Sequence, residues 1–335
     1  MVASLLLSAS MLLLSACGQQ GGSAPTTSPT PDASGSKKPI KIGVVQIVEH
    51  QALDAARDGF ISEMAKQGYA KDKDVTYDLQ SAQGNMDTAT SIAQKFSGDK
   101  VDLILAIATP TAQAAAQTTK DIPVLFTAVT DPVAAGLVKS MDKPGGNLTG
   151  TTDMNPVEEQ LSLIKEIKPE TKSIGIIYNS GEVNSKVQID MAKAVSGKLG
   201  ITIQEAAITN PTEVKQAAES MIGKVDAFYV PTDNMVVSSL AAILKIAEEQ
   251  KLPVIAGEEN SVKSGAIATY GIDYTKLGEQ TADMAVKVLK GEAKPADMAV
   301  EKQSKMKLTV NPAAAAKMGV TLPKAMLDRA DEVIK

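Results

Sequence analysis

The sequence is poor in the residues on which many catalytic, metal-binding and base-stacking sites depend. Its 335 residues include one cysteine, one histidine and no tryptophan, and aromatic residues make up only 3%. A single cysteine excludes an intramolecular disulfide. One histidine with scattered acids is a poor ligand set for a transition metal, and few aromatic rings weaken any interpretation based on stacking several sugars or bases.

Catalytic motifs and basic clusters are missing as well. The sequence contains no G-x-S-x-G, no H-E-x-x-H and no phosphate-binding glycine-rich loop, so an enzyme is not expected. The formal net charge is −5, and lysine and arginine do not cluster. Nucleic acid is therefore not an expected partner, because phosphate binding needs a concentrated basic face. No cofactor and no metal site are predicted.

The first 38 residues differ from the rest of the chain. Residues 1–17 form a short apolar run ending in Ala16-Cys17, which looks like a bacterial lipoprotein cleavage site and predicts a lipid anchor on Cys17. The run is too short for an ordinary transmembrane helix. It lacks the usual opening Lys or Arg, which a start codon assigned a few residues late would explain; a buried core helix is the alternative. Residues 18–38, rich in Gly, Ser, Thr, Pro and Gln, are predicted to be a disordered tether.

From Pro39 onward, short apolar runs alternate with segments of helical spacing. Strands are predicted at 40–47, 75–81, 101–108, 122–129, 173–178, 201–208, 226–230 and 253–256. Helices are predicted at 51–67, 87–96, 111–119, 132–139, 156–167, 185–199, 212–222 and 235–250. Continuous Val/Ile/Leu strands alternating with helices are typical of parallel sheets covered on both faces. The sequence therefore predicts an α/β fold with two similar four-strand lobes.

The last part of the chain adds two isolated strands, at 266–272 and 307–310, with a helix at 274–290 between them. Two strands cannot form a third domain. We expect them to join the two sheets already predicted, which requires the chain to cross between the lobes more than once.

Polar residues follow most of the predicted strands, where ligands bind in open parallel sheets. The candidate residues at these junctions, with Pro110 between two threonines and Asp153 at the passage into the second block, are Thr109, Pro110, Thr111, Thr130, Asp131, Asp153, Asn184, Ser185, Asp233, Asn234, Glu258 and Asp273. Helix capping alone would explain any one of them. Free N–H groups at a helix start also bind carboxylates, and opposing acids could hold an ammonium group. A cleft that offers both suits an amino acid.

Several of these junctions carry a family resemblance. The matching segments are 46–60, Ala108-Thr109-Pro110-Thr111-Ala112-Gln113, Ala128-Val129-Thr130-Asp131-Pro132, Pro144-Gly145-Gly146-Asn147-Leu148-Thr149-Gly150, Pro231-Thr232-Asp233-Asn234 and Gly271-Ile272-Asp273-Tyr274. In combination they are similar to the substrate-binding lipoproteins of ABC transporters associated with aromatic amino acid uptake, the TrpX-like family. The resemblance covers the chain from about Ile40 to its end.

The resemblance implies a type I periplasmic-binding-protein fold, in which two Rossmann-like lobes with parallel sheets are joined by three crossovers and the ligand lies between them. The crossovers are expected near 147–153, 270–273 and 299–305. Lobe 1 is then expected to comprise 40–152 with 273–302. Lobe 2 is expected to comprise 153–272 with 303–335.

The resemblance also implies roles for individual residues. Thr109, Pro110 and Thr111 match the position where related binders hold the ligand carboxylate. Further ligand contacts are expected from Thr130, Asp131, Asp153, Asn184, Ser185, Asp233, Asn234, Glu258 and Asp273. His50 is either a structural hydrogen-bonding residue or lines the cleft with Gln46 and Glu49. An apolar wall is expected from some of Tyr178, Phe228, Tyr229 and Tyr270, with the others in the core.

The expected function is therefore that of an extracytoplasmic, membrane-anchored binding protein of an ABC importer, monomeric, with the transporter permease as its partner. Its expected ligand is an amino acid, aromatic by resemblance, although the scarcity of aromatic residues leaves an aliphatic one open. The alternatives are a sugar or nucleoside-like solute, or a ligand-sensing subunit of a membrane receptor.

Overall fold

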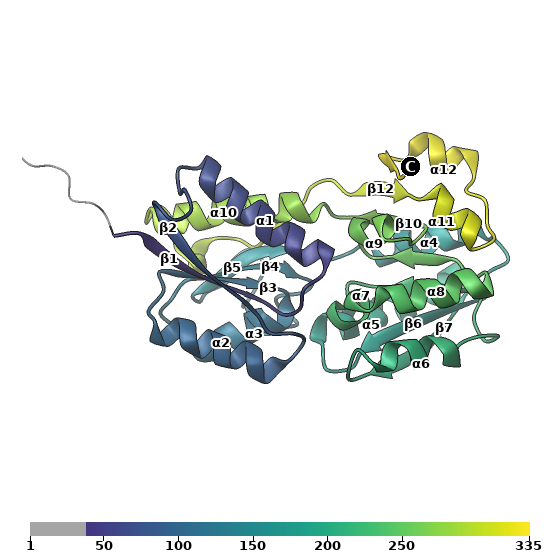
Figure 1. Cartoon of the computed structure of the whole chain (residues 1–335), viewed down its shortest axis with the longest axis horizontal. Helices are drawn as coiled ribbons and strands as arrows, with labels where there is room; N and C mark the ends of the chain where they lie inside the picture. Colours follow the sequence, from purple (N-terminus) through teal and green to yellow (C-terminus); the bar gives the residue numbers. More distant parts are fainter. Residues whose placement is uncertain (1–37) are drawn as a thin grey trace, which may run out of the picture. The chain divides into compact units, whose positions relative to one another are not determined.

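Two sheets organise the part of the chain that the computed structural model describes, residues 38–335 (Figure 1). The predicted signal peptide, the lipidation at Cys17 and nearly all of the predicted tether lie outside these residues. Within 38–335, no helix is both long enough and apolar enough to span a lipid bilayer.

The first sheet has the strand order β11-β5-β4-β3-β1-β2, and every neighbouring pair is parallel. Its strands are β1 (Ile40–Gln46), β2 (Val75–Ser81), β3 (Leu103–Ile107), β4 (Val124–Val129), β5 (Leu148–Thr152) and β11 (Glu301–Lys302). Helices α1 (Gln51–Lys66) and α10 (Tyr274–Leu289) cover one face, and α2 (Met86–Gly98) and α3 (Thr109–Thr118) cover the other (Figure 1). Because both faces are covered, every residue of β3 and β4 is buried, which explains why their sequences are apolar at nearly every position.

The second sheet has the order β13-β12-β10-β9-β8-β6-β7 and is parallel except for the pair β10–β12. Its strands are β6 (Ser173–Asn179), β7 (Thr202–Ile208), β8 (Ala227–Val230), β9 (Val254–Ala256), β10 (Ala268–Gly271), β12 (Lys307–Val310) and β13 (Glu332–Val333). Its helices are α4 (Val157–Ile167), α5 (Val183–Leu199), α6 (Glu213–Ser220), α7 (Asn234–Ser238), α8 (Leu240–Gln250), α9 (Glu259–Lys263), α11 (Pro312–Lys317) and α12 (Lys324–Arg329). A short 3₁₀ helix, Pro295–Asp297, precedes β11. Each sheet has its own apolar core.

The chain passes between the two sheets three times, after β5, after β10 and after β11. The predicted α/β class, with two lobes and three crossovers, is confirmed. We refer to the first sheet with its helices as lobe 1 and to the second as lobe 2. The sequence-based residue limits of the lobes remain our proposal.

One helix prediction was wrong, and another was right except for one interruption. Residues 132–139 form turns, because Gly136 adopts a φ of +70° that a helix does not allow. The predicted helix 235–250 is two helices, α7 and α8, interrupted at Ser239, whose ψ of 13° leaves the helical region. Helices α9, α11 and α12 and strands β5, β11 and β13 were not predicted, since segments of two to six residues show no usable periodicity. The first crossover, expected near 147–153, in fact begins only after β5, which belongs to the first sheet.

Glycine at the contact between α1 and α10 lets the two helix backbones approach closely. A Cβ atom added to Gly278 would lie 1.9 Å from the carbonyl oxygen of Ala56, and one added to Gly59 would lie 2.2 Å from that of Thr275. We predict that Gly278→Ala lowers the free energy of unfolding by at least about 2 kcal/mol in urea denaturation, since backbone must move to admit the methyl group. The control is Gly197→Ala in α5, where the methyl group meets nothing within 4 Å and should stabilise the helix. Equal effects of the two substitutions would contradict the prediction.

Candidate functional site

A small polar cavity, the inner cavity, lies where carboxyl ends of strands from the two sheets face each other. It is lined by His50, Leu53, Ala128, Thr130, Asp153, Asn184, Thr232, Asp233, Asn234, Val237, Glu258 and Tyr274. Its free volume is about 10 Å³, which is room for about one water molecule. Side chains therefore nearly fill the space between the lobes at this point.

Asp153 lies directly after β5, on the first crossover, and is 3% exposed. Tyr274 donates a hydrogen bond to its Oδ2 at 2.6 Å, and the hydroxyl of Thr130 donates to its Oδ1 at 3.2 Å. Burial raises the pKa of Asp153, although these hydrogen bonds act in the opposite direction. Because Tyr274 is the first residue of α10, just after the second crossover, this contact joins two crossovers inside the cavity.

Glu258 follows β9 and caps the start of α9. Its carboxylate accepts hydrogen bonds from the backbone N–H groups of Asn260 and Ser261, at 2.6 and 2.7 Å, and from the Ser261 hydroxyl. Burial nevertheless raises the pKa of Glu258 to about 7. The cavity therefore contains a second acid whose negative charge is costly until a positive group lies beside it.

Asp233 is fully buried and holds the start of α7 in place. Its carboxylate accepts from the backbone N–H of Val236 at 2.9 Å, from that of Asn179 at 2.6 Å and from the Ser185 hydroxyl at 2.6 Å. Ser185 consequently lies behind Asp233 and does not line the cavity. Capping is therefore the role of Asp233 that these contacts define directly.

We predict that Asp233→Ala lowers the free energy of unfolding by about 3 kcal/mol, because it leaves buried donors without acceptors. Asp131→Ala is the matched control, since the partly exposed Asp131 also caps backbone, accepting from Val133 and Ala134. Urea denaturation of both variants measures the difference. The prediction fails if Asp233→Ala costs no more than Asp131→Ala.

Sequence reasoning missed a buried acid next to Asp233. Glu182 accepts amide N–H groups from Asn184 at 2.9 Å, Asn234 at 2.5 Å and Asn179 at 3.2 Å. Burial, together with the neighbouring charge of Asp233, raises the pKa of Glu182 to about 7. Its position at the N-cap of α5, two residues before Asn184, was the available signal.

His50 stands at the start of α1 and lines the inner cavity from lobe 1. Its Nδ1 is buried and has no hydrogen-bond partner within residues 38–335. Burial lowers its pKa to about 4, against the influence of Asp54 and Asn234. The imidazole is therefore neutral at pH 7 and adds no positive charge to the cavity.

The backbone is strained just before α3 and near the end of β4. Ala108 has φ 83° and ψ 158°, a region that is adopted almost only by glycine, and Ala128 has φ 57°. Such strain concentrates at functional sites. The nearby Thr109 is buried, and its hydroxyl has no partner in the described chain, as is the case for Oε1 of Gln46.

The expected carboxylate site at the start of α3 lies outside the lining of the inner cavity. The Thr111 hydroxyl donates to the carbonyl groups of Ile107 and Ala108, at 2.7 and 2.9 Å, which occupies its proton. Pro110 lines a different pocket, together with Met86. Of the residues proposed from the sequence, the cavity brings together Thr130, Asp153, Asn184, Asp233, Asn234, Glu258 and His50.

Asp273 lies in another pocket, at the start of α10 with Lys276, Gln303 and Lys307. It pairs with Lys307 at 2.9 Å and caps α10 through the N–H of Lys276. Burial opposes the shift, but the hydrogen bond from Lys307 leaves the pKa of Asp273 below its usual value. Lys307 therefore already compensates the negative charge of Asp273, which does not line the inner cavity.

The expected apolar wall is only partly available. Phe228 and Tyr229 belong to the core of lobe 2, where the Tyr229 hydroxyl donates to Gln160 at 2.6 Å. Tyr270 lines a pocket elsewhere in lobe 2 with Arg329, and Tyr178 is partly buried against the same core. The apolar residues that do line the inner cavity are Leu53, Ala128 and Val237, none of which the sequence singled out.

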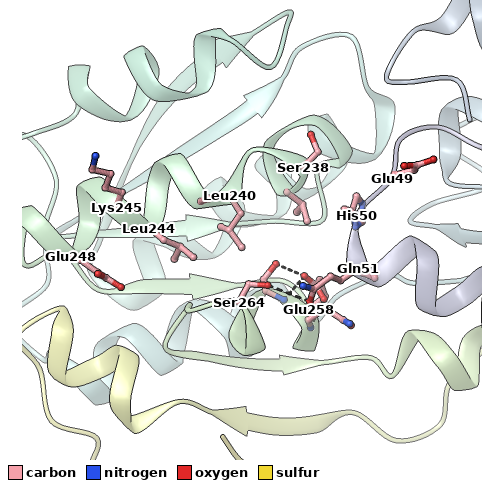
Figure 2. A pocket seen from close by; sticks show the side chains of 15 residues that line it. Glu49, His50, Gln51, Ser238, Leu240, Leu244, Lys245, Glu248, Glu258 and Ser264 are labelled. Atoms are coloured by element: carbon pink, nitrogen blue, oxygen red, sulfur yellow. Dashed lines mark hydrogen bonds between the residues drawn. The ribbon is translucent and has the colours of Figure 1, made fainter. Parts of the chain in front are cut away.

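A larger pocket, the outer pocket, adjoins the inner cavity and has a volume of about 490 Å³ (Figure 2). Its lining includes Glu49, Gln51, Leu240, Leu244, Lys245, Glu248, Asn260 and Ser264. It shares His50, Val237 and Glu258 with the inner cavity. A hydrogen bond of 3.4 Å from Ser264 to Gln51 joins the lobes at its edge.

Two α/β lobes, joined by three crossovers and facing each other across buried polar residues, define a type I periplasmic binding protein. The same fold occurs in solute-binding proteins only 16% identical to this chain, with TM-scores of 0.60 and 0.61. More specifically, the chain belongs to the ABC transporter substrate-binding protein family, whose family model matches residues 41–334. The family membership expected from the sequence motifs is thereby confirmed.

Closer relatives are known by sequence and by structure. A tyrosine-binding protein of Clostridioides difficile (strain R20291) is 48% identical over 84% of this chain and 81% of its own. A solved ABC domain from Streptococcus pneumoniae in complex with L-Trp is 38% identical, has a TM-score of 0.85 and covers 89% of this chain and 100% of its own. The ligand-free, open structure of a substrate-binding protein with adhesive properties from Clostridium difficile is 48% identical, has a TM-score of 0.66 and covers 88% and 99%.

The TM-scores run opposite to the sequence identities. The chain superimposes better on the 38% identical complex than on the 48% identical open structure. The inner cavity, with a free volume of about 10 Å³, leaves little space between the lobes at this point.

Proposed function

We propose that this protein binds an aromatic amino acid, tyrosine or tryptophan, between its lobes and presents it to an ABC importer. The observation that carries the proposal is the inner cavity itself, whose lining comes from both lobes and in which Asp153 is buried between Thr130 and Tyr274 of lobe 1. The relatives named as tyrosine-binding and as an L-Trp complex support this choice of ligand class.

The ligand ammonium group is the part that the inner cavity is equipped to recognise. Asp153 and Glu258 are its proposed partners, because their buried negative charges gain most from a cation beside them. Leu53 and Val237, which face the same space from the two lobes, are proposed to contact the aromatic ring. A free volume of about 10 Å³ is too small for an amino acid, so the lobes must separate to admit one.

Closure of the lobes then couples binding to transport. Contacts made by one ligand to both lobes stabilise the closed arrangement, which the permease recognises. The Tyr274–Asp153 hydrogen bond joins the first two crossovers, and Gln303 on the third bonds the backbone N–H and C=O of Asp273 at 3.2 and 2.5 Å. All three crossovers are thus connected by side-chain hydrogen bonds, so ligand contact at Asp153 is proposed to bias the hinge. No covalent step is involved.

The proposal also covers residues 1–37 and the predicted site residues of lobe 1 that do not line the inner cavity. Cleavage before Cys17, lipidation of its thiol, a tether through residue 38 and an extracytoplasmic location fit a binding protein that works beside a membrane importer. Thr109, Thr111, Gln46 and Glu49 are proposed to act indirectly, by shaping the lobe 1 side of the cleft.

Thermal-shift scans of the purified protein test the proposal. Tyrosine or tryptophan at hundredfold excess over its dissociation constant should add about 2.7 kcal/mol to the stability. Aliphatic amino acids, sugars and nucleosides form the comparison set. A shift with a sugar or nucleoside and none with any amino acid would refute the proposed ligand class while leaving the fold-based role as a binding protein.

A further inference from the structure

We propose that Glu182 is a positioning residue, which turns the side-chain amide of Asn184 so that its oxygen accepts a hydrogen bond from the ligand ammonium group. This inference rests on the proposed function and adds a third acceptor to the two acids proposed there. Its basis is a buried amide oxygen without a partner beside the inner cavity, on a side chain whose orientation the neighbouring groups determine.

The amide nitrogen of Asn184 faces groups that accept hydrogen bonds. Its Nδ2 donates to Oε2 of Glu182 at 2.9 Å and to the backbone carbonyl oxygen of Thr232 at 3.2 Å. The Ser185 hydroxyl, 3.4 Å from Nδ2, donates its own proton to Asp233 and therefore also accepts here. Turning the amide over would place its oxygen, which has no proton, against these acceptors. The contacts thus determine that Oδ1 faces away from Glu182.

The oxygen of this amide is left without a donor. Asn184 is 3% exposed and lines the inner cavity, and its Oδ1 is buried with no hydrogen-bond partner among residues 38–335. A buried acceptor without a donor destabilises the ligand-free protein. A ligand that supplies the donor removes this penalty, so the unpaired oxygen favours binding.

The ligand ammonium group is suited to supply that donor. It carries three N–H groups, and two of them are assigned to Asp153 and Glu258 under the proposed function. These two acids and Asn184 line the same cavity, whose free volume of about 10 Å³ holds about one water molecule. An ammonium group is of similar size, so one such group can lie among all three side chains. Asn184 then accepts from the third N–H.

Helix capping does not explain Glu182. The residue stands at the N-cap of α5, but its side chain makes no capping hydrogen bond to the helix. In the described chain it accepts from the amides of three asparagines and from no cation. It is nevertheless buried, and the nearby charge of Asp233 further disfavours its ionised form. A buried acid that is unfavourable in this way and caps no helix is typical of a functional site.

One oxygen of Glu182 orients the side chains of the inner cavity. Oε2 accepts from Asn184 at 2.9 Å and from Asn234 at 2.5 Å, and both asparagines line the cavity. Oε1 accepts only from Asn179, at 3.2 Å, and Asn179 is not part of that lining. A proton on Glu182 is therefore placed on Oε1, so that Oε2 accepts whether or not the acid is ionised.

Calorimetric titrations of the purified full chain test the inference, with tyrosine, tryptophan and their N-methyl derivatives as probes. Methylation replaces one N–H donor, and the methyl group should face the neutral Asn184 amide, since hydrogen bonds to the two acids are stronger. Each N-methyl derivative should therefore bind the wild type at least tenfold more weakly than its parent. Asn184→Ala should bind the parents at least tenfold more weakly than the wild type does, and its preference for the parent should shrink to less than threefold.

Asn179→Ala is the matched control, because it also removes an amide that donates to Glu182, but from a residue outside the cavity lining. It should keep the affinity for the parent amino acids within threefold. Glu182→Met has a side chain of similar length without an acceptor oxygen and should weaken parent binding at least fivefold. Glu182→Gln retains an oxygen that can occupy the Oε2 position and should bind at least threefold more tightly than Glu182→Met. Thermal unfolding without ligand checks that each variant is folded.

Equal losses of affinity in Asn184→Ala and Asn179→Ala would overturn the inference and leave the proposed function standing. The same holds if the N-methyl derivatives bind the wild type as tightly as their parents do, a comparison that needs no variant. Equal affinities of Glu182→Met and Glu182→Gln would overturn the positioning role of Glu182. Failure of both parent amino acids to bind the wild type would overturn the proposed function together with the inference.

Discussion

Replacing Asp153 with asparagine is expected to lower the affinity for the aromatic amino acid at least about 100-fold while the protein remains folded. Removing one partner of a buried, hydrogen-bonded charge pair costs about 2–5 kcal/mol of binding, and about 2.7 kcal/mol corresponds to a factor of 100. The fold should tolerate the change because asparagine has the same shape and can still accept from Thr130. Burial already penalises the ionised carboxylate at this position, so losing the charge does not remove a stabilising group from the ligand-free protein.

Calorimetric titration measures the affinity, and thermal unfolding without ligand checks the fold. Asp131→Asn is the matched control, since it makes the same chemical change at a junction residue that does not line the inner cavity. Tyr274→Phe removes the donor to Asp153 but leaves the carboxylate, and should weaken binding by about tenfold through loss of one charge-assisted hydrogen bond. An Asp153→Asn variant that keeps its affinity within threefold would show that the ammonium group is held elsewhere.

Much of the fold could be predicted because burial on both faces leaves a strong pattern in the sequence. Strands β3 and β4 are apolar at nearly every position since helices cover both sides of the sheet. The two strands at the end of the chain, β10 and β12, were expected to join the two predicted sheets, but both join the second sheet, where they pair with each other. The helix predicted at 132–139 failed because helical spacing alone does not reveal that Gly136 has left-handed backbone.

The candidate site was predictable where sheet topology alone determines position. Asp233 and Glu258 each follow a predicted parallel strand, and the carboxyl ends of parallel strands share one edge. Asp153 was expected on the first crossover, and it directly follows β5, a strand that was not predicted. Tyr274 was not predictable in the same way, because its contact with Asp153 joins residues 121 positions apart through the packing of α10 on lobe 1. Its neighbour Asp273 was expected in the cleft, but β12 runs antiparallel beside β10 and brings Lys307 next to it.

The acids that define the inner cavity also connect ligand binding to pH. A group with a raised folded-state pKa binds its proton more tightly in the folded protein, so its stabilising contribution is complete below the unfolded-state pKa and is lost as the pH rises through the folded-state value. For Glu182 and Glu258 this window runs from about 4.5 to about 7. His50 acts in the opposite direction: its contribution is complete above about 6.5 and is lost as the pH falls through about 4.

As the pH rises through this range, Glu182 and Glu258 therefore lower the free energy of unfolding, and His50 raises it. The free energy of unfolding of the ligand-free protein should fall by at least about 3 kcal/mol between pH 5 and pH 7.5, counting about 1.4 kcal/mol per pKa unit for these three groups. The raised pKa of Asp153 acts in the same direction. Surface carboxyl groups with lowered pKa values, such as that of Glu166 beside Arg329, change the stability only at more acidic pH. Urea denaturation across this range measures the trend.

Ligand affinity should show the opposite pH dependence. An ammonium group beside Glu258 favours the ionised carboxylate, so binding below pH 7 must release the proton that Glu258 carries in the ligand-free protein. The association constant should then rise about tenfold per pH unit from pH 5 to about 7, roughly 100-fold in all, and level off above. Calorimetry in two buffers with different ionisation enthalpies counts the released proton directly.

Glu258→Gln should flatten the pH profile of the affinity. Glu182→Gln, outside the cavity lining, should leave that profile steep while reducing the pH dependence of stability. A wild-type affinity that does not change with pH would exclude Glu258 as a partner of the ammonium group, since a carboxyl group with a pKa of about 7 cannot pair with a cation over this range without losing its proton.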